Sequence, residues 1–342
     1  MENLHTGDML DLTGRAKEDL EAGIIRTPLE PKETFYDDPL RMLRAVRFSA
    51  RFGFAIEPKT WQAIEDEAFR LNLMGPAPPV VSAERIRDEF LKMIMAEPVR
   101  SVSALEMLRC SNLLKQFFPE LLDMVGVTQN DWHLYEVWEH TMVAMGSLKP
   151  DAQLELRLGL LLHDVGKPAT RTEDEKGVHF YEHQFVGAEI ARKALTRLKL
   201  THDQIKDVTN IVALHMRLGE ARPEWSDAPV KRLIRATAEY VDVLFELSRC
   251  DHAAMRQDVD ATDLIALRAR MDELNRLSNV VQIESPLDGI EIMDALGIPP
   301  GPIIKEAKEF LVNEVIEGRV GDGDKEASRI ILLDWYRARL QK

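Results

Sequence analysis

Apolar residues recur along most of this chain at the three- and four-residue spacing of one face of an α-helix. The clearest stripes are Leu154, Leu158, Leu161 and Leu162, then Val208, Ile211 and Val212, and then Leu244 and Leu247. Strand-like alternation of β-branched residues is almost absent, apart from a possible short strand at 23–27. The pattern therefore predicts an all-α fold.

Segments rich in Pro and Gly interrupt these helices at 75–82, 149–153 and 297–302, and a polar loop is expected at 167–177. A chain of 342 residues is long enough for two or three domains. We expect four parts: a largely irregular junction at 1–35, helices at 36–132 with three of them in 38–95, a bundle of about five helices at 133–255, and a helical tail at 256–342.

Composition narrows the class of protein. Hydrophobic residues make up 45% and charged residues 30%, which excludes wholesale disorder. The net charge of −14 argues against a protein that coats nucleic acid, and no DNA partner is expected. The charge does not exclude an RNA enzyme with one local basic face. Two cysteines, no signal peptide and no apolar run of about 20 residues predict a cytoplasmic protein that does not contact a membrane.

Five helical stretches each carry a metal-competent side chain in phase with their apolar stripe. These side chains are His140, His163 with Asp164, His183, His215 and Asp251. A single inward histidine is more often a hydrogen-bonded core residue, but burying the whole set without partners costs several kcal/mol. One shared metal centre satisfies all of them. Lys167, shortly after Asp164, extends the site unless it is an ordinary loop lysine.

This ordered set resembles the HD superfamily of metal-dependent phosphohydrolases. The resemblance implies one divalent metal held by His140, His163, Asp164 and Asp251, and a second that Asp164 bridges to His183 and His215. Asp164 and Lys167 are then the expected catalytic residues, since a metal activates water and the lysine helps to neutralise phosphate oxygens. Mixed His/Asp ligation suits Mn, Fe, Co, Ni or Zn, and suits Mg less well.

A second signal is the arginine-rich segment 36–54. Asp38 and Pro39 form a strong helix start, with the aspartate as N-cap. The arginines that follow are Arg41, Arg44, Arg47 and Arg51. They occupy about a third of the helix circumference, which favours contact with a polyphosphate or an RNA backbone. The alternative is a capped helix whose arginines pair with acids elsewhere.

The sequence DDPLRMLRAVRFSARFGF resembles the neck motif of bacterial tRNA nucleotidyltransferases (CCA-adding enzymes) and related poly(A) polymerases. Segments 11–27, 81–94 and 285–318 are similar to their head–neck junction, next neck helix and C-terminal RNA-binding region. The resemblance implies tRNA or RNA 3′ ends as partners, with Asp38 and Arg41 selecting the base of CTP or ATP. Arg44 and Arg47 are then expected near the nucleotide phosphates. Asp37 stands where the family usually has Glu.

The catalytic head of that family, with its Gly-Ser loop and paired metal-binding aspartates, is expected before residue 11, where this sequence has only MENLHTGDML. We therefore expect that this chain alone does not add CCA.

Three hypotheses for the function of this chain remain. The favoured one is an HD phosphohydrolase acting on RNA ends or nucleotides, such as 2′,3′-cyclic phosphates or 2′-phosphates. The others are the neck, body and tail of a CCA-adding enzyme or poly(A) polymerase whose head is supplied elsewhere, and a non-catalytic tRNA-binding protein.

Overall fold

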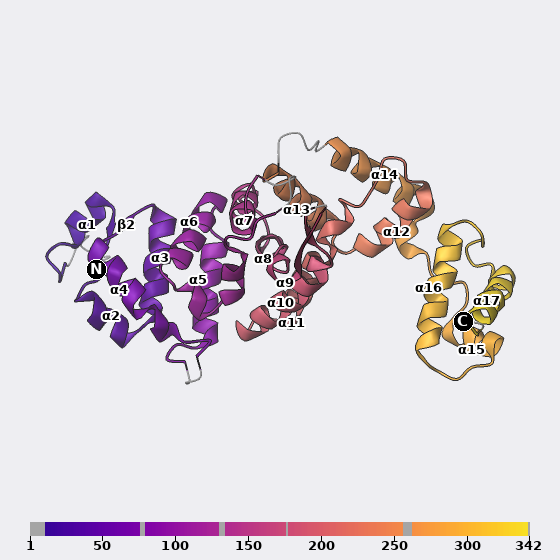
Figure 1. The fold of residues 1–342 in the computed structure, drawn as a ribbon, viewed down its shortest axis with the longest axis horizontal. Helices are drawn as coiled ribbons and strands as arrows, with labels where there is room; N and C mark the ends of the chain where they lie inside the picture. The colour runs from indigo at the N-terminus through magenta and orange to yellow at the C-terminus, as the bar shows by residue number, and fades with distance from the viewer. Residues whose placement is uncertain (1–10, 76–78, 130–133, 176, 256–261, 341–342) are drawn as a thin grey trace, which may run out of the picture. The chain divides into compact units, whose positions relative to one another are not determined.

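The computed structural model describes residues 11–340, apart from 76–78, 130–133, 176 and 256–261. Within this part of the chain α-helices make up almost all of the regular structure, which confirms the all-α prediction (Figure 1). Contacts divide the chain into two compact units. The first holds the chain up to Met216 and the segment that starts at Glu246, and the second holds Arg217–Phe245 and the C-terminal helices.

The N-terminal part of the first unit contains six helices and two very short strands in the described residues. Their bounds are α1 (Ala16–Ala22), β1 (Ile24–Ile25), α2 (Pro31–Asp37), α3 (Leu40–Phe52), β2 (Ala55–Ile56), α4 (Pro58–Glu67), α5 (Ala83–Ile94) and α6 (Pro98–Cys110). Short 3₁₀ turns lie at Ala68–Leu71, Leu114–Gln116 and Pro119–Met124. β1 pairs in parallel with β2, which confirms the short strand expected at 23–27.

Two details differ from expectation here. The segment before residue 36 is more helical than predicted, because Pro31 provides a favourable first position for α2, which buries Phe35. α1 buries none of its residues, so no apolar stripe marks it in the sequence. The arginine helix α3 begins at Leu40, one residue later than expected, although the Asp38 carboxylate still accepts the backbone N–H of Leu40 at 3.2 Å.

The later part of the first unit contains α7 (Val137–Gly146), α8 (Leu154–Leu162), α9 (Lys167–Thr170), α10 (His183–Arg197), α11 (His202–Leu214), a 3₁₀ turn at His215–Arg217, and the end of α13 (Val241–Ala253). Strands β3 (Arg171–Asp174) and β4 (Gly177–Phe180) form an antiparallel hairpin, so the prediction of a plain loop at 167–177 was wrong. Every residue of β3 is exposed, and therefore no apolar alternation reveals the strand in the sequence.

Helix α8 is buried along almost its whole length and carries a fully buried arginine, Arg157. Its guanidinium donates to four backbone carbonyls. The acceptors are Ala152 (2.9 Å), Ile94 (2.8 Å), Ala96 (2.6 Å) and Pro150 (2.8 Å). Two of these carbonyls lie at the end of α5 or just after it, and two precede α8. Arg157 thus fixes α8, the helix that leads to His163 and Asp164, against the end of α5.

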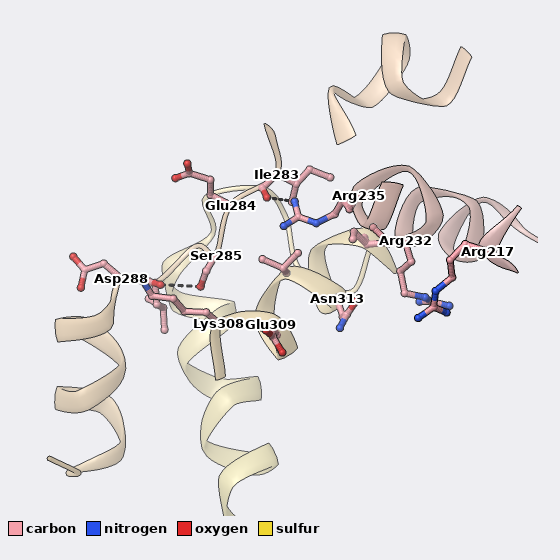
Figure 2. Close-up of a pocket in the computed structure, with 14 residues that line it drawn as sticks. Arg217, Arg232, Arg235, Ile283, Glu284, Ser285, Asp288, Lys308, Glu309 and Asn313 are labelled. Carbon is pink, nitrogen blue, oxygen red and sulfur yellow. Dashed lines mark hydrogen bonds between the residues drawn. The ribbon is translucent and has the colours of Figure 1, made fainter. Parts of the chain in front are cut away.

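The second unit contains α12 (Asp227–Thr237), the start of α13, α14 (Thr262–Ser278), a 3₁₀ turn at Val280–Gln282, α15 (Gly289–Leu296), α16 (Pro302–Ile316) and α17 (Lys325–Leu340). Its C-terminal helices share a small core that includes Leu287, Ile292, Leu311 and Leu332. A pocket of about 1070 Å³ lies between α12, the segment 283–288 and α16, where Arg235 donates to the carbonyl of Ile283 (Figure 2). None of the described helices is both long and apolar enough to span a bilayer.

Candidate metal centre

The six predicted ligands come together in the first unit from five helical elements. His140 lies on α7, His163 and Asp164 directly follow α8, His183 begins α10, His215 directly follows α11, and Asp251 lies on α13. Five of them are 0 to 6% exposed, and the side chain of Asp251 is 20% exposed. Residues that are far apart in the sequence thus converge on one buried polar cluster.

A close backbone approach brings His183 beside Asp164. Gly166 lies against the first turn of α10, and a Cβ at this position would be 2.1 Å from the carbonyl oxygen of His183 and 2.6 Å from the backbone nitrogen of Gly187. Any larger residue would push the turn at 163–167 away from α10. The glycine after the HD dipeptide therefore has a specific packing role in building the centre.

The donor atoms form two adjoining clusters. One consists of His140, His163 and Asp251, and the other of Asp164, His183 and His215, and in each cluster one donor atom per residue lies within 4.8 Å of the others. Such sets of three imidazole and carboxylate donors are typical of divalent metal sites.

Asp164 faces both clusters with different oxygens. Its Oδ2 is 3.2 Å from His163 Nε2 and 4.0 Å from His140 Nε2. Its Oδ1 is 3.4 Å from His183 Nε2 and 4.0 Å from His215 Nε2. A carboxylate in this position has the geometry to bridge two metal ions.

The histidine tautomers are set by backbone carbonyls. The Nδ1–H groups of His163, His183 and His215 donate to the carbonyls three residues earlier, at 2.7, 2.8 and 2.7 Å. Each ring therefore directs its Nε2 at the centre, where the neutral imidazole could ligate a metal. His183 and His215 bring these two nitrogens within 3.2 Å of each other, an arrangement that a cation stabilises. The buried Nε2 of His163 makes no hydrogen bond among the described residues. The residues therefore fit a metal.

The charges of the centre shift its pKa values strongly. Burial raises the pKa of Asp164, but the charges of His163 and Lys167 outweigh burial and hold it well below the usual range. Burial lowers the pKa of His163, but the carboxylates of Asp164 and Asp251 raise it to about 10. Burial and the neighbouring His163 lower the pKa of His215 to about 3. Without a metal, the two carboxylates therefore attract positive charge to the centre.

Lys167 and one residue that the sequence did not indicate complete this region. The ammonium of Lys167 lies 2.7 Å from Asp164 Oδ2 and the side chain is 7% exposed, so it belongs to the centre rather than to a solvated loop. It also donates to Gln129 Oε1 at 2.6 Å. Gln129 precedes α7 by several residues and has no apolar stripe around it, so the sequence gives no signal for it.

The arginine helix has a mixed environment. Arg41 is exposed and donates to the carbonyl of Thr34 at 3.0 Å, and Arg44 is exposed as well. Arg47 differs, because its guanidinium pairs with the buried carboxylate of Glu89 on α5. Arg41 Nη1 also lies 3.9 Å from Asp37 Oδ2, so the alternative interpretation, pairing with acids, holds for Arg47 and for Arg41.

The opposite end of the helix borders a pocket of about 440 Å³ in the first unit. Its basic lining residues are Arg47, Arg51, Lys92 and Arg100. A Cβ on Gly53 would be 2.7 Å from Arg100 Nη1, so this glycine leaves room for the guanidinium. Among the described residues neither Arg51 nor Arg100 has an acidic partner within 4.0 Å. At the start of the helix, Asp38 accepts from Arg85 at 2.8 Å.

Two cysteines with different environments give a simple test of this packing. Cys250, next to Asp251, is buried, and burial raises the pKa of its thiol to about 11, whereas Cys110 is exposed. We expect Ellman's reagent at pH 8 to modify one thiol rapidly in the native protein and two in urea. Rapid modification of both thiols in the native protein, or fast labelling that persists in Cys110→Ser, would contradict the packing around Asp251.

Two family models match the chain. The HD domain model covers residues 131–263, the range that contains all six clustered donors. A model described as the probable RNA and SrmB-binding site of polymerase A covers residues 53–124. The fold and the donor clusters thus define a chain with an HD domain preceded by an RNA-binding helical segment. The HD domain and its two donor clusters confirm the prediction of a divalent-metal cofactor, without identifying the metal.

Sequence relatives extend this likeness over most of the chain. The CC-adding tRNA nucleotidyltransferase of Thermus thermophilus is 34% identical over 318 residues, which are 90% of this chain and 69% of the relative. The A-adding tRNA nucleotidyltransferase of Deinococcus radiodurans is 33% identical over 317 residues, 89% of this chain and 70% of the relative. The chain therefore belongs to the tRNA nucleotidyltransferase family, as the neck motif predicted.

A solved structure supports the fold. The crystal structure of the Bacillus stearothermophilus CCA-adding enzyme in complex with CTP superposes with a TM-score of 0.58 at 22% identity. The match covers 96% of this chain and 69% of that structure. The helical architecture is therefore shared over nearly the whole chain.

Proposed function

We propose that this chain is a divalent-metal-dependent phosphohydrolase, acting at its HD domain on phosphoesters of RNA ends or nucleotides. The observation that carries the proposal is the position of Asp164, whose Oδ2 lies near His163 and His140 and whose Oδ1 lies near His183 and His215. A buried carboxylate between two imidazole sets is suited to holding a metal centre and is poorly suited to being part of an apolar core.

The side chains have distinct roles in this proposal. A bound divalent metal lowers the pKa of water toward neutrality and neutralises phosphate oxygens. His140, His163, Asp164 and Asp251 would hold it, and His183 and His215 would hold a second ion together with Asp164. The backbone carbonyls that accept from three of the histidines keep each Nε2 aimed at the centre. Lys167 places a buried positive charge beside Asp164, where it attracts a phosphoryl group.

The proposal is tested on protein stripped with EDTA and reloaded with Mn, Co, Ni, Mg or Zn. We expect hydrolysis of 2′,3′-cyclic nucleotides in at least one loaded form, with little or none in the stripped form. Nucleoside 2′-phosphates and bis(p-nitrophenyl) phosphate serve as further substrates. If no loaded form hydrolyses any of them, the proposed function fails.

The second cluster reports the number of metal ions. If the active centre holds two ions, His183→Ala and His215→Ala are expected to be nearly as damaging to hydrolysis as His163→Ala. If one ion suffices, these two substitutions are expected to reduce hydrolysis less than His163→Ala does. The measurement is the initial rate together with the metal content of each variant. A His163→Ala protein that keeps both metal and activity would contradict either form of the centre.

We propose a second role for the helical parts that flank the HD domain, namely binding of tRNA 3′ ends and of CTP or ATP. The names of the two relatives, which add CC or A to tRNA, favour it. Asp38, Arg41 and Arg44 are the proposed nucleotide contacts, and the side chains of both arginines are exposed. The proposed tail contacts lie in the second unit, where Arg217, Arg232 and Lys308 line the pocket of Figure 2.

The basic pocket beyond the arginine helix is the proposed contact for the RNA backbone. Arg51→Gln and Arg100→Gln are each expected to weaken binding of a tRNA acceptor-stem hairpin and to reduce the slope of log Kd against log salt by roughly 1. Fluorescence anisotropy between about 50 and 200 mM salt measures both effects. Arg192→Gln, an exposed arginine on α10, is the matched control. Unchanged slopes in both variants would exclude phosphate contacts here.

A further inference from the structure

Lys167 is held from two sides. Its Nζ lies 2.7 Å from Asp164 Oδ2 and 2.6 Å from Gln129 Oε1, and the Phe180 ring centroid is 5.5 Å away. An ammonium group has three donors, so the hydrogen bond to Gln129 and the ion pair with Asp164 leave at least one donor for another partner. The side chain is 7% exposed, which means that its direction is set by these contacts.

Gln129 is itself fixed by its second amide atom. Its Nε2 donates to the carbonyl of Tyr135 at 3.1 Å, so the oxygen faces Lys167. Glu136 fixes the chain three residues before Gln129, because its carboxylate accepts the backbone N–H groups of Gly126 and Trp138 at 2.9 and 3.0 Å. The amide is thus a preorganised, uncharged acceptor.

The neutrality of this acceptor matters for the chemistry. A carboxylate in place of the amide would also hold the ammonium, but it would cancel the positive charge and repel a phosphate. The Oδ2 atom of Asp164 has a competing use, because it also faces His163 in the proposed metal centre. With that oxygen committed to a metal, the amide of Gln129 would be the contact that keeps the lysine in place.

We propose that Gln129 is a positioning residue for phosphate recognition, holding the Lys167 ammonium so that its third donor points at a phosphoryl oxygen of the substrate. This inference rests on the proposed phosphohydrolase function and adds a residue from outside the histidine and aspartate set. Gln129 acts through Lys167 and does not itself contact the substrate.

The test compares Gln129→Met, Lys167→Met and the double variant, each loaded with Mn. Binding of inorganic phosphate is measured by calorimetry, and kcat/KM is measured for 2′,3′-cyclic AMP. We expect Gln129→Met to weaken phosphate binding by about tenfold, as expected for a lost hydrogen bond to a charged group. In the Lys167→Met background the same change should have almost no further effect, because the group that it positions is gone.

Two further variants exclude a merely structural role. Gln129→Glu retains an acceptor and is expected to bind phosphate no better than Gln129→Met. Gln62→Met, on the exposed face of α4, is the matched control and should behave as wild type. Metal content and melting temperature are recorded for every variant, and are expected to stay unchanged.

The outcomes separate this inference from the proposed function. Equal losses from Gln129→Met in the two backgrounds, no loss in either, full rescue by glutamate, or a wild type that binds no phosphate would each overturn the inference. If phosphate binding follows the expected pattern but no phosphoester is hydrolysed, the inference stands and the proposed function fails. If hydrolysis is strong and Gln129→Met has no effect, only the inference fails.

Discussion

Replacing Asp164 with alanine is expected to abolish metal retention and to lower phosphoester hydrolysis by about a hundredfold or more. Among the described residues, Asp164 is the one carboxylate within 4.0 Å of imidazole nitrogens in both clusters. Its removal also leaves the Lys167 ammonium without its 2.7 Å anionic partner. The loss is therefore expected to exceed that of any other single ligand.

The measurement combines metal content by mass spectrometry with the rate on 2′,3′-cyclic AMP. Asp164→Asn keeps the side-chain volume and removes only the charge, so it should fail to a similar extent and exclude a cavity as the cause. Arg192→Ala, whose exposed side chain lies outside the centre, is expected to match wild type. A folded Asp164→Ala protein with wild-type activity would contradict the role of the centre.

Replacing Arg157 with methionine is expected to cost roughly 3–5 kcal/mol of folding stability, among the largest effects of any single substitution. The side chain is fully buried, and its hydrogen bonds to the carbonyls of Ala152 and Ile94 are buried as well, so these two carbonyls lose a partner without gaining water. Burial also lowers the pKa of Arg157. The free-energy costs of the four lost hydrogen bonds do not simply add up, because the surrounding backbone relaxes.

Urea unfolding followed by circular dichroism measures this loss. Arg157→Lys should recover only part of it, since a single ammonium cannot reach four carbonyls as the planar guanidinium does. Arg192→Met, a surface change on α10, is expected to stay within about 0.5 kcal/mol of wild type. An Arg157→Met protein whose free energy of unfolding stays within about 1 kcal/mol of wild type would show that these carbonyls find other partners.

The helical class was predictable because the apolar stripes are long and clear. Leu158, Ile211 and Leu247, taken from three predicted stripes, are each at most 1% exposed. The hairpin at β3 and β4 was missed because its first strand is exposed throughout, so periodicity carries no information there. α1 was missed for the same reason, since it buries no residue.

The candidate centre was predictable in its membership and only partly in its contacts. Each of its four histidines lies in phase with a stripe, so its inward direction follows from the helical period. The position of Gln129 depends on contacts such as those from its amide to the carbonyl of Tyr135 and from Gly126 to Glu136, and no local sequence pattern encodes them. The pairing of Arg47 with Glu89 depends on how α3 packs against α5, which the spacing of the arginines does not reveal.

The central claim is that His140, His163, Asp164, His183, His215 and Asp251 form one metal centre, and metal stoichiometry tests it most directly. Protein stripped with EDTA is dialysed against Mn, Co, Ni or Zn and analysed for bound metal. We expect one or two ions per wild-type chain and close to none in Asp164→Ala. Wild-type protein that retains no metal above the buffer level, or an Asp164→Ala variant that retains the wild-type amount, would contradict it.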